Sequence, residues 1–363
     1  MRKRKRRKRR LQRKMKKRLI SVILCMVMLA LSLTACGGGD KKTLRVYNAG
    51  EYIDKTLLTD FEKEYNCKVV YETFDSNEAM YTKVMSGSEY DIIIPSDYMV
   101  ERLIKEDYLQ PIDKSLIPNM SKITPNLLGK DFDPDNTYTV PYFWGSVGII
   151  YDKTIVSEED AAQGWDLLLN DKYKGQIYMY DSERDAFMIA LKALGYSMNT
   201  DNKAELDAAY EWLCTQRDTM EPVYVGDDVI DNMISGNMAI AVVYSGDGAY
   251  IMAENENIAF VEPEQGTNLW YDSMVITKNC TETELAHQFI NFMLEEDNAY
   301  ANTQFVGYSS PVTTVYEKMR DEDYAGIDAY VPRTGYAQDE VFGYQETEIK
   351  SYCADLWTKV KAH

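Results

Sequence analysis

The sequence predicts an α/β protein with two lobes. Short apolar runs of strand length alternate with stretches whose apolar residues recur at helical spacing. Strands separated by helices favour largely parallel sheets, and ligands of such open sheets bind beyond the carboxyl ends of the strands. About 328 residues remain after an N-terminal segment that we expect to be removed, and this exceeds what one hydrophobic core usually holds.

The expected strands are apolar runs rich in β-branched and aromatic residues, at positions 44–47, 68–71, 91–94, 146–151, 176–180, 239–244 and 274–277. The expected helices carry apolar residues three and four positions apart, at positions 55–65, 79–86, 100–106, 186–194, 203–217 and 282–294. Strand and helix therefore alternate along most of the chain, which is typical of the α/β class.

The N-terminal segment reads as an export signal. Residues 1–36 contain fourteen Lys and Arg and no acid, and an apolar run at 19–33 is too short to span a bilayer comfortably. The sequence LTAC at 33–36 resembles the bacterial lipoprotein box, in which the Cys becomes the lipid-bearing first residue. We therefore expect residues 1–35 to be a signal peptide and 36–42 a tether, with a lipid on Cys36 holding the domain to the extracytoplasmic face of the cell membrane. An ordinary cleaved signal with a chance Cys is the alternative.

The chain is strongly acidic once this segment is removed. Fourteen of the 40 Lys and Arg residues are lost, so 26 remain against 58 Asp and Glu, a formal charge of −32. Such a surface repels nucleic acid and anionic lipid and favours cationic partners. All 28 Tyr and five Trp lie after residue 46, and aromatic faces beside carboxylates suit an organic cation.

Carboxylates recur beside aromatic or hydroxyl side chains at the ends of the expected strands. Four such clusters follow a strand and a fifth precedes one. Carboxylates gathered near one cleft repel each other unless a cation lies between them, so their recurrence indicates a polycationic ligand or a metal. The clusters occupy positions 48–52, 95–98, 181–185, 244–247 and 270–273.

Helix capping is the alternative for each carboxylate taken singly. Ser182 and Asp185 fit a capping box, and Asp97 and Asp247 stand where a following helix would begin. The aromatic residues at these positions also suit ordinary packing between lobes.

Catalytic and metal-binding interpretations find little support. The two histidines are His287, inside an amphipathic stretch, and the terminal His363, so a His-based triad is not indicated. Residues 131–135 imitate the start of a calcium loop, but Asn136 replaces the turn glycine and Tyr142 stands in place of the bidentate glutamate. We expect an Asx-rich turn there, and we expect no enzyme activity, no cofactor and no metal.

The cysteines beyond Cys36 show neither a CxxC spacing nor a cluster with histidine. An extracytoplasmic location permits a disulfide, but the pairing stays open and buried free thiols are the favoured interpretation. These residues are Cys67, Cys214, Cys280 and Cys353.

Five segments together resemble a known family. They are FDSNEAMY at 74–81, YDIIIPS at 90–96, FDPDN at 132–136, VPYFWG at 140–145 and WYDS at 270–273. In this order they resemble the spermidine/putrescine-binding proteins of polyamine ABC transporters, over residues 43–363. The resemblance implies a two-lobed periplasmic-binding-protein-like fold with a ligand cleft and a hinge between the lobes.

The same resemblance implies lobe boundaries, ligand contacts and partners. One lobe would hold residues 43–143 and 272–305, and the other 144–271 and 306–363. The protein would be a monomer that receives a polyamine and delivers it to the permease subunits of an ABC transporter. The implied contacts are Tyr52, Ser96, Tyr98, Asp185, Tyr244, Asp247, Trp270, Asp272 and Tyr308. Glu51 is a further candidate.

Some positions depart from the family pattern. Ala49 stands where the family usually has Trp, and Ser182 stands where one branch has a second acid. Asp247 matches an acid of the putrescine-preferring branch, and Gln345 is a candidate for a late Gln contact. The choice between spermidine and putrescine therefore stays open.

Three functions from different classes follow. The favoured one is an extracytoplasmic polyamine-binding component of an ABC importer. The second is a binding protein of the same fold for another cationic or small solute; an anionic ligand would require Arg side chains or helix N-termini, and Arg184 is the one Arg among the clusters. The third, a hydrolase or metalloenzyme, lacks a nucleophile with its base or a His-rich metal shell.

Overall fold

Two lobes share one pair of long central strands in the computed structural model, which describes residues 41–226 and 228–362. The strands pair in the order β2-β1-β3-β9-β4-β7-β5-β6, and β8 also pairs with β4. Their bounds are β1 Thr43–Ala49, β2 Lys68–Phe74, β3 Ile92–Ile93, β4 Thr139–Asp152, β5 Ile177–Tyr180, β6 Val223–Val225, β7 Ile240–Tyr244, β8 Ile258–Val261 and β9 Leu269–Ile276.

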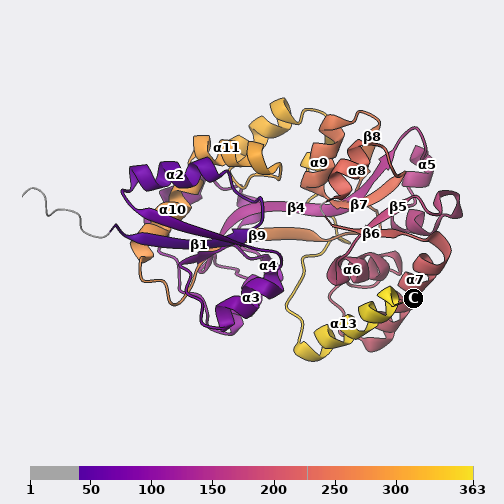
Figure 1. Ribbon diagram of the computed structural model, residues 1–363, viewed down its shortest axis with the longest axis horizontal. Helices are drawn as coiled ribbons and strands as arrows, with labels where there is room; N and C mark the ends of the chain where they lie inside the picture. The colour runs from indigo at the N-terminus through magenta and orange to yellow at the C-terminus, as the bar shows by residue number, and fades with distance from the viewer. Residues whose placement is uncertain (1–40, 227, 363) are drawn as a thin grey trace, which may run out of the picture.

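Strand β4 connects the lobes without a break. All fourteen of its residues are buried, and its first half pairs with β9 while Val147 to Asp152 pair with β7 and β8. In Figure 1, β4 and β9 run between β1 on one side and β5 to β8 on the other. We call the part with β1–β3 the first lobe and the part with β5–β8 the second lobe.

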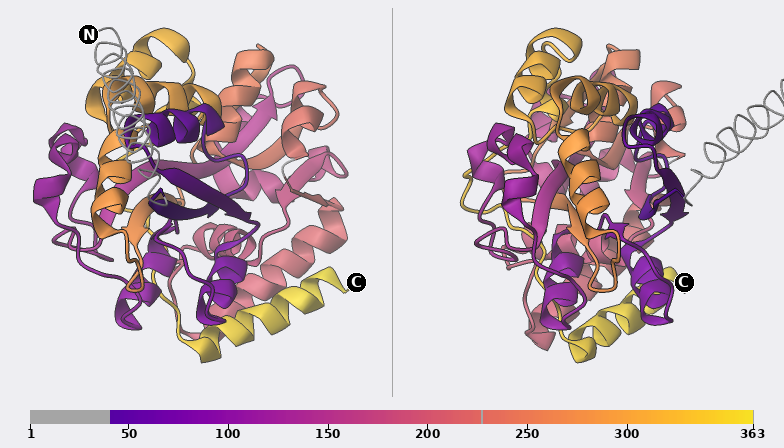
Figure 2. Two further views of the ribbon diagram at one scale, coloured as in Figure 1. Left: turned by 60° about the vertical axis from the view of Figure 1, so that its left-hand side comes forward. Right: turned by 90° about the vertical axis from the view of Figure 1, so that its left-hand side faces the viewer.

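Helices flank the sheet above and below, as the turned views in Figure 2 show. Helix α2 and the pair α10 and α11 lie on one side of the first lobe, and α3 lies on the other side, the side of α13 (Figures 1 and 2). Their bounds are α2 Lys55–Glu64, α3 Asn77–Met85, α4 Asp97–Lys105, α5 Glu158–Ala161, α6 Glu183–Ala193, α7 Lys203–Met220, α8 Val229–Ile234, α9 Ser245–Glu254, α10 Thr283–Met293, α11 Glu296–Val306, α12 Thr313–Lys318 and α13 Thr347–Lys361.

Side-chain caps explain where several helices begin. Asp54 accepts the backbone N–H of Thr56 before α2, Ser76 accepts that of Ala79 before α3, and Asn202 accepts that of Ala204 before α7. Each cap satisfies a donor that the first helical turn leaves unpaired. Phe61 of α2 packs edge-on against Phe289 of α10, with ring centroids 5.1 Å apart, and this contact joins the two helices over the first-lobe core.

The α/β class is confirmed, and every strand and helix predicted from the sequence has a counterpart. The prediction of largely parallel sheets is only partly right. Strands β1, β2 and β3 pair in parallel, as do β5, β6 and β7, but β9 pairs antiparallel with β3 and β4, and β4 pairs antiparallel with β7. Strand β4 leads the chain from the first lobe to the second, and β9 leads it back. The two central strands are therefore antiparallel to each other.

The sequence analysis did not predict β6, β8 and helices α5, α8, α9 and α11 to α13. The predicted signal peptide at 1–35, Cys36 and most of the tether at 36–42 lie outside the described residues. The proposed lobe boundaries stay a prediction. Within the described ranges, the structure contains no helix of the length and apolarity needed to cross a bilayer.

Candidate ligand-binding site

Asp272 lies near the middle of β9, between the two lobes. The hydroxyl of Tyr52, in the loop after β1, donates to Asp272 Oδ2 over 2.6 Å. The other carboxylate oxygen, Oδ1, is buried and has no hydrogen-bond partner among the described residues. Ser96 faces Asp272 in an isolated β-bridge. The Ser96 hydroxyl also interacts with this carboxylate, but Oδ1 itself accepts no well-formed hydrogen bond from the described residues. An under-satisfied buried acceptor is costly, so this oxygen indicates a place for a donor from outside the protein.

Two further carboxylates lie in the second lobe, each held by tyrosine. The hydroxyl of Tyr244, at the end of β7, donates to Asp185 Oδ2 over 2.8 Å. Asp247, in the first turn of α9, accepts hydroxyl groups from Tyr180 over 2.8 Å and from Tyr308 over 3.0 Å. The carboxyl ends of β5 and β7 thus bring acids and phenols together, as the sequence clusters predict.

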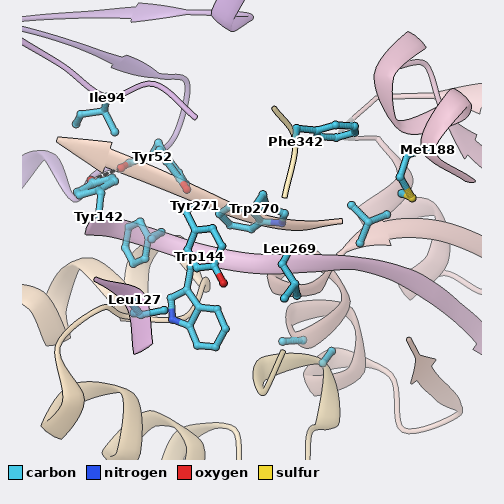
Figure 3. Close-up of a cluster of buried hydrophobic side chains, with 14 of the residues drawn as sticks. Tyr52, Ile94, Leu127, Tyr142, Trp144, Met188, Leu269, Trp270, Tyr271 and Phe342 are labelled. Carbon is cyan, nitrogen blue, oxygen red and sulfur yellow. Dashed lines mark hydrogen bonds between the residues drawn. The ribbon is translucent and has the colours of Figure 1, made fainter. Parts of the chain in front are cut away.

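Aromatic rings link these carboxylates in one continuous series, which we call the aromatic box. Neighbouring ring centroids are between 4.9 and 6.2 Å apart, and most meet edge to face, a geometry that aromatic pairs favour. Figure 3 shows Tyr52 and Tyr142 beside β9 and Trp270 further along the same strand toward the second lobe. The series runs Tyr142, Tyr52, Tyr308, Trp270, Tyr244 and Tyr180.

Two glycines allow these rings to approach the backbone. A Cβ on Gly145 of β4 would lie 2.4 Å from the ring of Trp270, and one on Gly246 of α9 would lie 1.4 Å from the ring of Tyr308. Such contacts are impossible without moving the rings. Trp270 is fixed further by its indole N–H, which donates to the carbonyl of Ser146 over 3.2 Å.

Burial sets the charge state of the site. It raises the pKa of Asp272, and the hydroxyls of Tyr52 and Ser96 offset only part of this effect. Burial likewise raises the pKa of Asp185, opposed by Ser182, Tyr244 and the charge of Arg184. A nearby cation would favour the ionised form of both carboxylates.

The tyrosines remain hydrogen-bond donors. Burial, together with the neighbouring carboxylates, raises the pKa values of Tyr52, Tyr180 and Tyr244 well above their usual range. Their hydroxyls orient the carboxylates without neutralising them, so the carboxylates keep their affinity for a cation.

The structure brings most of the predicted contact residues together, but not all. Tyr98 lies under the guanidinium of Arg184, 3.7 Å from the ring centroid, and its hydroxyl is 3.3 Å from Glu78 Oε2. Glu51 is exposed, and its carboxylate lies 3.4 Å from Lys55 Nζ. Among the described residues, Glu51 therefore contacts a surface lysine and not a residue of the aromatic box.

Asp97 has a structural role that the sequence left open. Its two carboxylate oxygens accept the backbone N–H groups of Tyr98 over 2.7 Å and of Tyr271 over 3.0 Å. Burial raises its pKa to about 8, against the effect of these hydrogen bonds. It therefore fixes the start of α4 to β9 beside Asp272.

The capping interpretation holds for Ser182, but it does not account for Asp185 or Asp247. Ser182 accepts the backbone N–H of Asp185 over 3.3 Å, so the cap is present. The side chains of Asp185 and Asp247, however, accept tyrosine hydroxyls. Tyr180 was not among the predicted contacts, although it ends an expected strand.

Other polar residues that the sequence analysis considered serve the fold. His287 Nε2 accepts the backbone N–H of Asp113 over 2.9 Å, and its Nδ1 donates to the carbonyl of Thr283 over 2.7 Å. The carboxylate of Asp133 accepts the backbone N–H groups of Thr137, Tyr138 and Thr139. His287 is a buried helix residue with a structural role, and the predicted Asx-rich turn is confirmed.

The described residues contain no group of three or more His, Cys, Asp or Glu arranged to hold a metal ion. The four described cysteines are free thiols, three of them buried, and burial raises the pKa of Cys280 to about 12 and that of Cys353 to about 11.

Comparison with known proteins places the chain in a family. The model of the bacterial extracellular solute-binding proteins matches residues 56–326. The spermidine/putrescine-binding periplasmic protein of Escherichia coli K12 is 34% identical over 291 residues, which cover 80% of this chain and 83% of that protein.

Two solved structures agree with this assignment. PotD of Streptococcus pneumoniae, a spermidine/putrescine ABC transporter substrate-binding protein solved with calcium and HEPES, is 38% identical, with a TM-score of 0.77 and coverage of 88% of this chain and 98% of that one. The Tp0655 (TpPotD) lipoprotein of Treponema pallidum is 26% identical, with a TM-score of 0.77 and coverage of 88% and 99%.

The chain belongs to the bacterial extracellular solute-binding proteins. This confirms the two-lobed fold predicted from the sequence motifs. The family is extracytoplasmic by description, which agrees with the predicted export of the chain.

The packing of Tyr308 on Gly246 yields a stability prediction. In an exposed helix, Gly→Ala would stabilise by about 1 kcal/mol, but Gly246→Ala forces the Tyr308 ring to move. We expect Gly246→Ala to lower the free energy of unfolding by about 1–3 kcal/mol in urea titrations. Gly50→Ala is the control, since its Cβ would meet nothing within 4 Å. A Gly246→Ala protein as stable as the parent would contradict the packing described.

Proposed function

We propose that this protein is the substrate-binding component of an ABC importer, which captures polyamines outside the cytoplasm and delivers them to the membrane permease. The observation that carries the proposal is the aromatic box with its three carboxylates, Asp185, Asp247 and Asp272, each held by tyrosine hydroxyls. The relatives from Escherichia coli and Streptococcus pneumoniae are named as spermidine/putrescine-binding or transport proteins, which supports the same ligand class here.

The chemistry of the box suits an alkyl chain with ammonium groups. An ammonium has three N–H donors and needs several oxygen acceptors once it leaves water. On the side of the first lobe, Asp272 Oδ1 offers a buried acceptor. On the side of the second lobe, Asp185 and Asp247 offer further acceptors. The rings of Tyr308 and Trp270 lie between them, where methylene groups would displace water from apolar surface.

Binding without turnover is part of the proposal. The functional groups of the box are carboxylates and phenols, and His287 is occupied by backbone partners on both ring nitrogens. A nucleophile activated by an adjacent base is the usual mark of covalent catalysis, and the described site holds its acids with tyrosine instead. The relatives from Escherichia coli and Streptococcus pneumoniae are likewise named as binding proteins.

We propose that Ala49, which departs from the family pattern, and Asp247, which matches an acid of the putrescine-preferring branch, influence which polyamine is preferred. Ala49 removes one expected aromatic wall, whereas Asp247 supplies an acid that Tyr180 and Tyr308 hold in place. Three carboxylates distributed between two lobes are compatible with either two or three ammonium groups, so chain length is a matter for titration.

We also propose that the protein acts as a monomer anchored by a lipid on Cys36. The basic and apolar residues before Cys36 and the glycines after it support the lipid anchor, and the relative from Treponema pallidum is named as a lipoprotein. The acidic domain would not adhere to an anionic bilayer by charge alone.

Asp272→Asn tests the site directly. The amide keeps the size of the side chain but removes the charge from a desolvated position, so a bound ammonium loses its counter-ion. We expect the affinity for putrescine, cadaverine, spermidine or spermine to fall at least about 100-fold, measured by isothermal titration calorimetry. Asp355→Asn, on the exposed face of α13, should bind as the parent does.

The same titrations decide between ligand classes. Binding of an amino acid or a metal ion in place of every polyamine would overturn the proposed ligand. Unchanged polyamine affinity in Asp272→Asn would overturn the proposed site.

Polyamine binding should release protons. The pKa values of Asp272 and Asp185 are raised in the free protein, and a bound ammonium lowers them again. Affinity should therefore decrease as pH falls through the raised pKa values of the free carboxylates. In the free protein these two carboxylates should contribute stability at low pH that is lost as pH rises through their raised pKa values, because the folded carboxylates bind protons more tightly than the unfolded chain does. Calorimetry in buffers of different ionisation enthalpy measures the proton count, and net proton uptake would contradict the assignment.

Cys36→Ser tests the anchor. Without the thiol that would carry the lipid, we expect the protein either to leave the membrane fraction or to keep its signal segment. Fractionation followed by intact-mass measurement distinguishes these outcomes from normal processing. Membrane retention with normal cleavage in the variant would contradict lipidation at Cys36.

A further inference from the structure

Charged side chains from the two lobes meet outside the aromatic box. Lys350 Nζ, in the first turn of α13, lies 2.9 Å from Glu78 Oε1, in the first turn of α3. Helix α3 contacts β2 of the first lobe, whereas α13 packs on α6 and α7 of the second. Figures 1 and 2 show both helices on the same side of the sheet. The ion pair therefore bridges the lobes.

A second cation crosses between the lobes at the same place. The guanidinium carbon of Arg184, in α6, lies 3.7 Å from the ring centroid of Tyr98 in α4 and 5.0 Å from that of Phe342. The Tyr98 hydroxyl lies 3.3 Å from Glu78 Oε2. Arg184 Nη1 is buried and has no hydrogen-bond partner among the described residues. Stacking on the rings is therefore a main contact of this guanidinium.

Glu78 is the shared anion of this contact. Burial raises its pKa, but the hydrogen bond and charge of Lys350 and the charge of Arg184 outweigh burial and leave the pKa below its usual value. Three more acids interact with Arg184: Glu183, whose pKa burial raises, and Asp97 and Asp185, which belong to the centre of the molecule. Glu78 is therefore ionised at neutral pH, with two cations of the opposite lobe around it.

The chain before α13 is firmly attached to the second lobe. The buried Lys192 Nζ of α6 lies 2.6 Å from Glu340 Oε2, and Asn199 donates to the carbonyl of Val341 over 2.8 Å. After Val341 the chain contacts the first lobe, where the backbone N–H of Tyr344 donates to Glu101 Oε2 of α4 over 2.7 Å. Helix α13 then packs on α6 and α7 of the second lobe. Lys350 thus moves with the second lobe.

We propose that Lys350 and Glu78 form a latch, with Arg184 stacked on Tyr98 as its second contact, which stabilises the closed arrangement of the lobes and so sets ligand affinity without touching the ligand. The inference rests on the proposed function. Ligand and latch both favour the closed form, so loss of the latch lowers the closed population and weakens the apparent affinity by the same factor for every ligand that requires closure. Lys350 is a positioning residue in this scheme.

Lys350→Gln gives a test in which the sign of the effect is decisive. Removing a positive charge near a site for cations should tighten polyamine binding if long-range charge alone matters. The latch predicts the opposite. Because the pair is partly exposed, at 35% and 43%, we expect putrescine and spermidine affinities to weaken by a common factor of about two to five. Lys359→Gln, an exposed lysine of the same helix, is the matched control and should show no weakening.

A double-variant cycle and scattering complete the test. Glu78→Gln should weaken binding at least as much, because Glu78 also faces Arg184 and the Tyr98 hydroxyl. Adding Lys350→Gln to it should cost little more, because the Lys350–Glu78 contact is already lost. Ligand-free Lys350→Gln should also have a larger radius of gyration than the parent. Tighter or unchanged binding in Lys350→Gln, or additive losses, would overturn the latch. If the parent binds no polyamine, the proposed function fails, and an unchanged radius of gyration would then overturn the latch by itself.

Discussion

The site depends on carboxylates that the fold removes from water between its two lobes. Asp272 and Asp185 are buried deeply enough to raise their pKa values, and the tyrosine hydroxyls that contact them satisfy only part of their hydrogen-bonding capacity. In a protein interior such groups are costly unless a cation joins them. The free energy that burial costs the empty site is recovered when a polyamine, as proposed, supplies its ammonium groups.

The fold can hold these acids because its centre is continuous. Strand β4 runs through both lobes with every residue buried, and β9 pairs along it up to Trp270 and Leu269. The aromatic box is built on this pair, and Gly145 and Gly246 bring Trp270 and Tyr308 against the backbone. The centre of the aromatic box, at Trp270, is part of the central sheet. Its two sides, at Tyr52 and Tyr244, belong to different lobes.

Closure then balances three interactions. Repulsion among acids of the two lobes favours an open cleft, whereas a bound cation and the contacts of Glu78 with Lys350 and Tyr98 with Arg184 favour a closed one. Lys350 and Arg184 are side chains of the protein itself, so they offset the negative charge of Glu78 whether or not a ligand is bound. This arrangement gives an affinity that residues outside the box can adjust.

The sequence by itself determined the α/β class, seven strands and six helices, and the acids and aromatics at strand ends, because period and local composition are properties of neighbouring residues. Three helices of ten or more residues, α9, α11 and α13, were not predicted. The sequence also did not predict short elements such as β6 and α8, or the antiparallel direction of β4 and β9, because partners distant in sequence decide them. Only the tertiary structure separated Asp97, which binds two backbone N–H groups, from Asp247, which accepts two tyrosine hydroxyls. It also set Glu51 on the surface and joined Lys350 to Glu78, since contacts over 272 residues of sequence arise only when both lobes have folded.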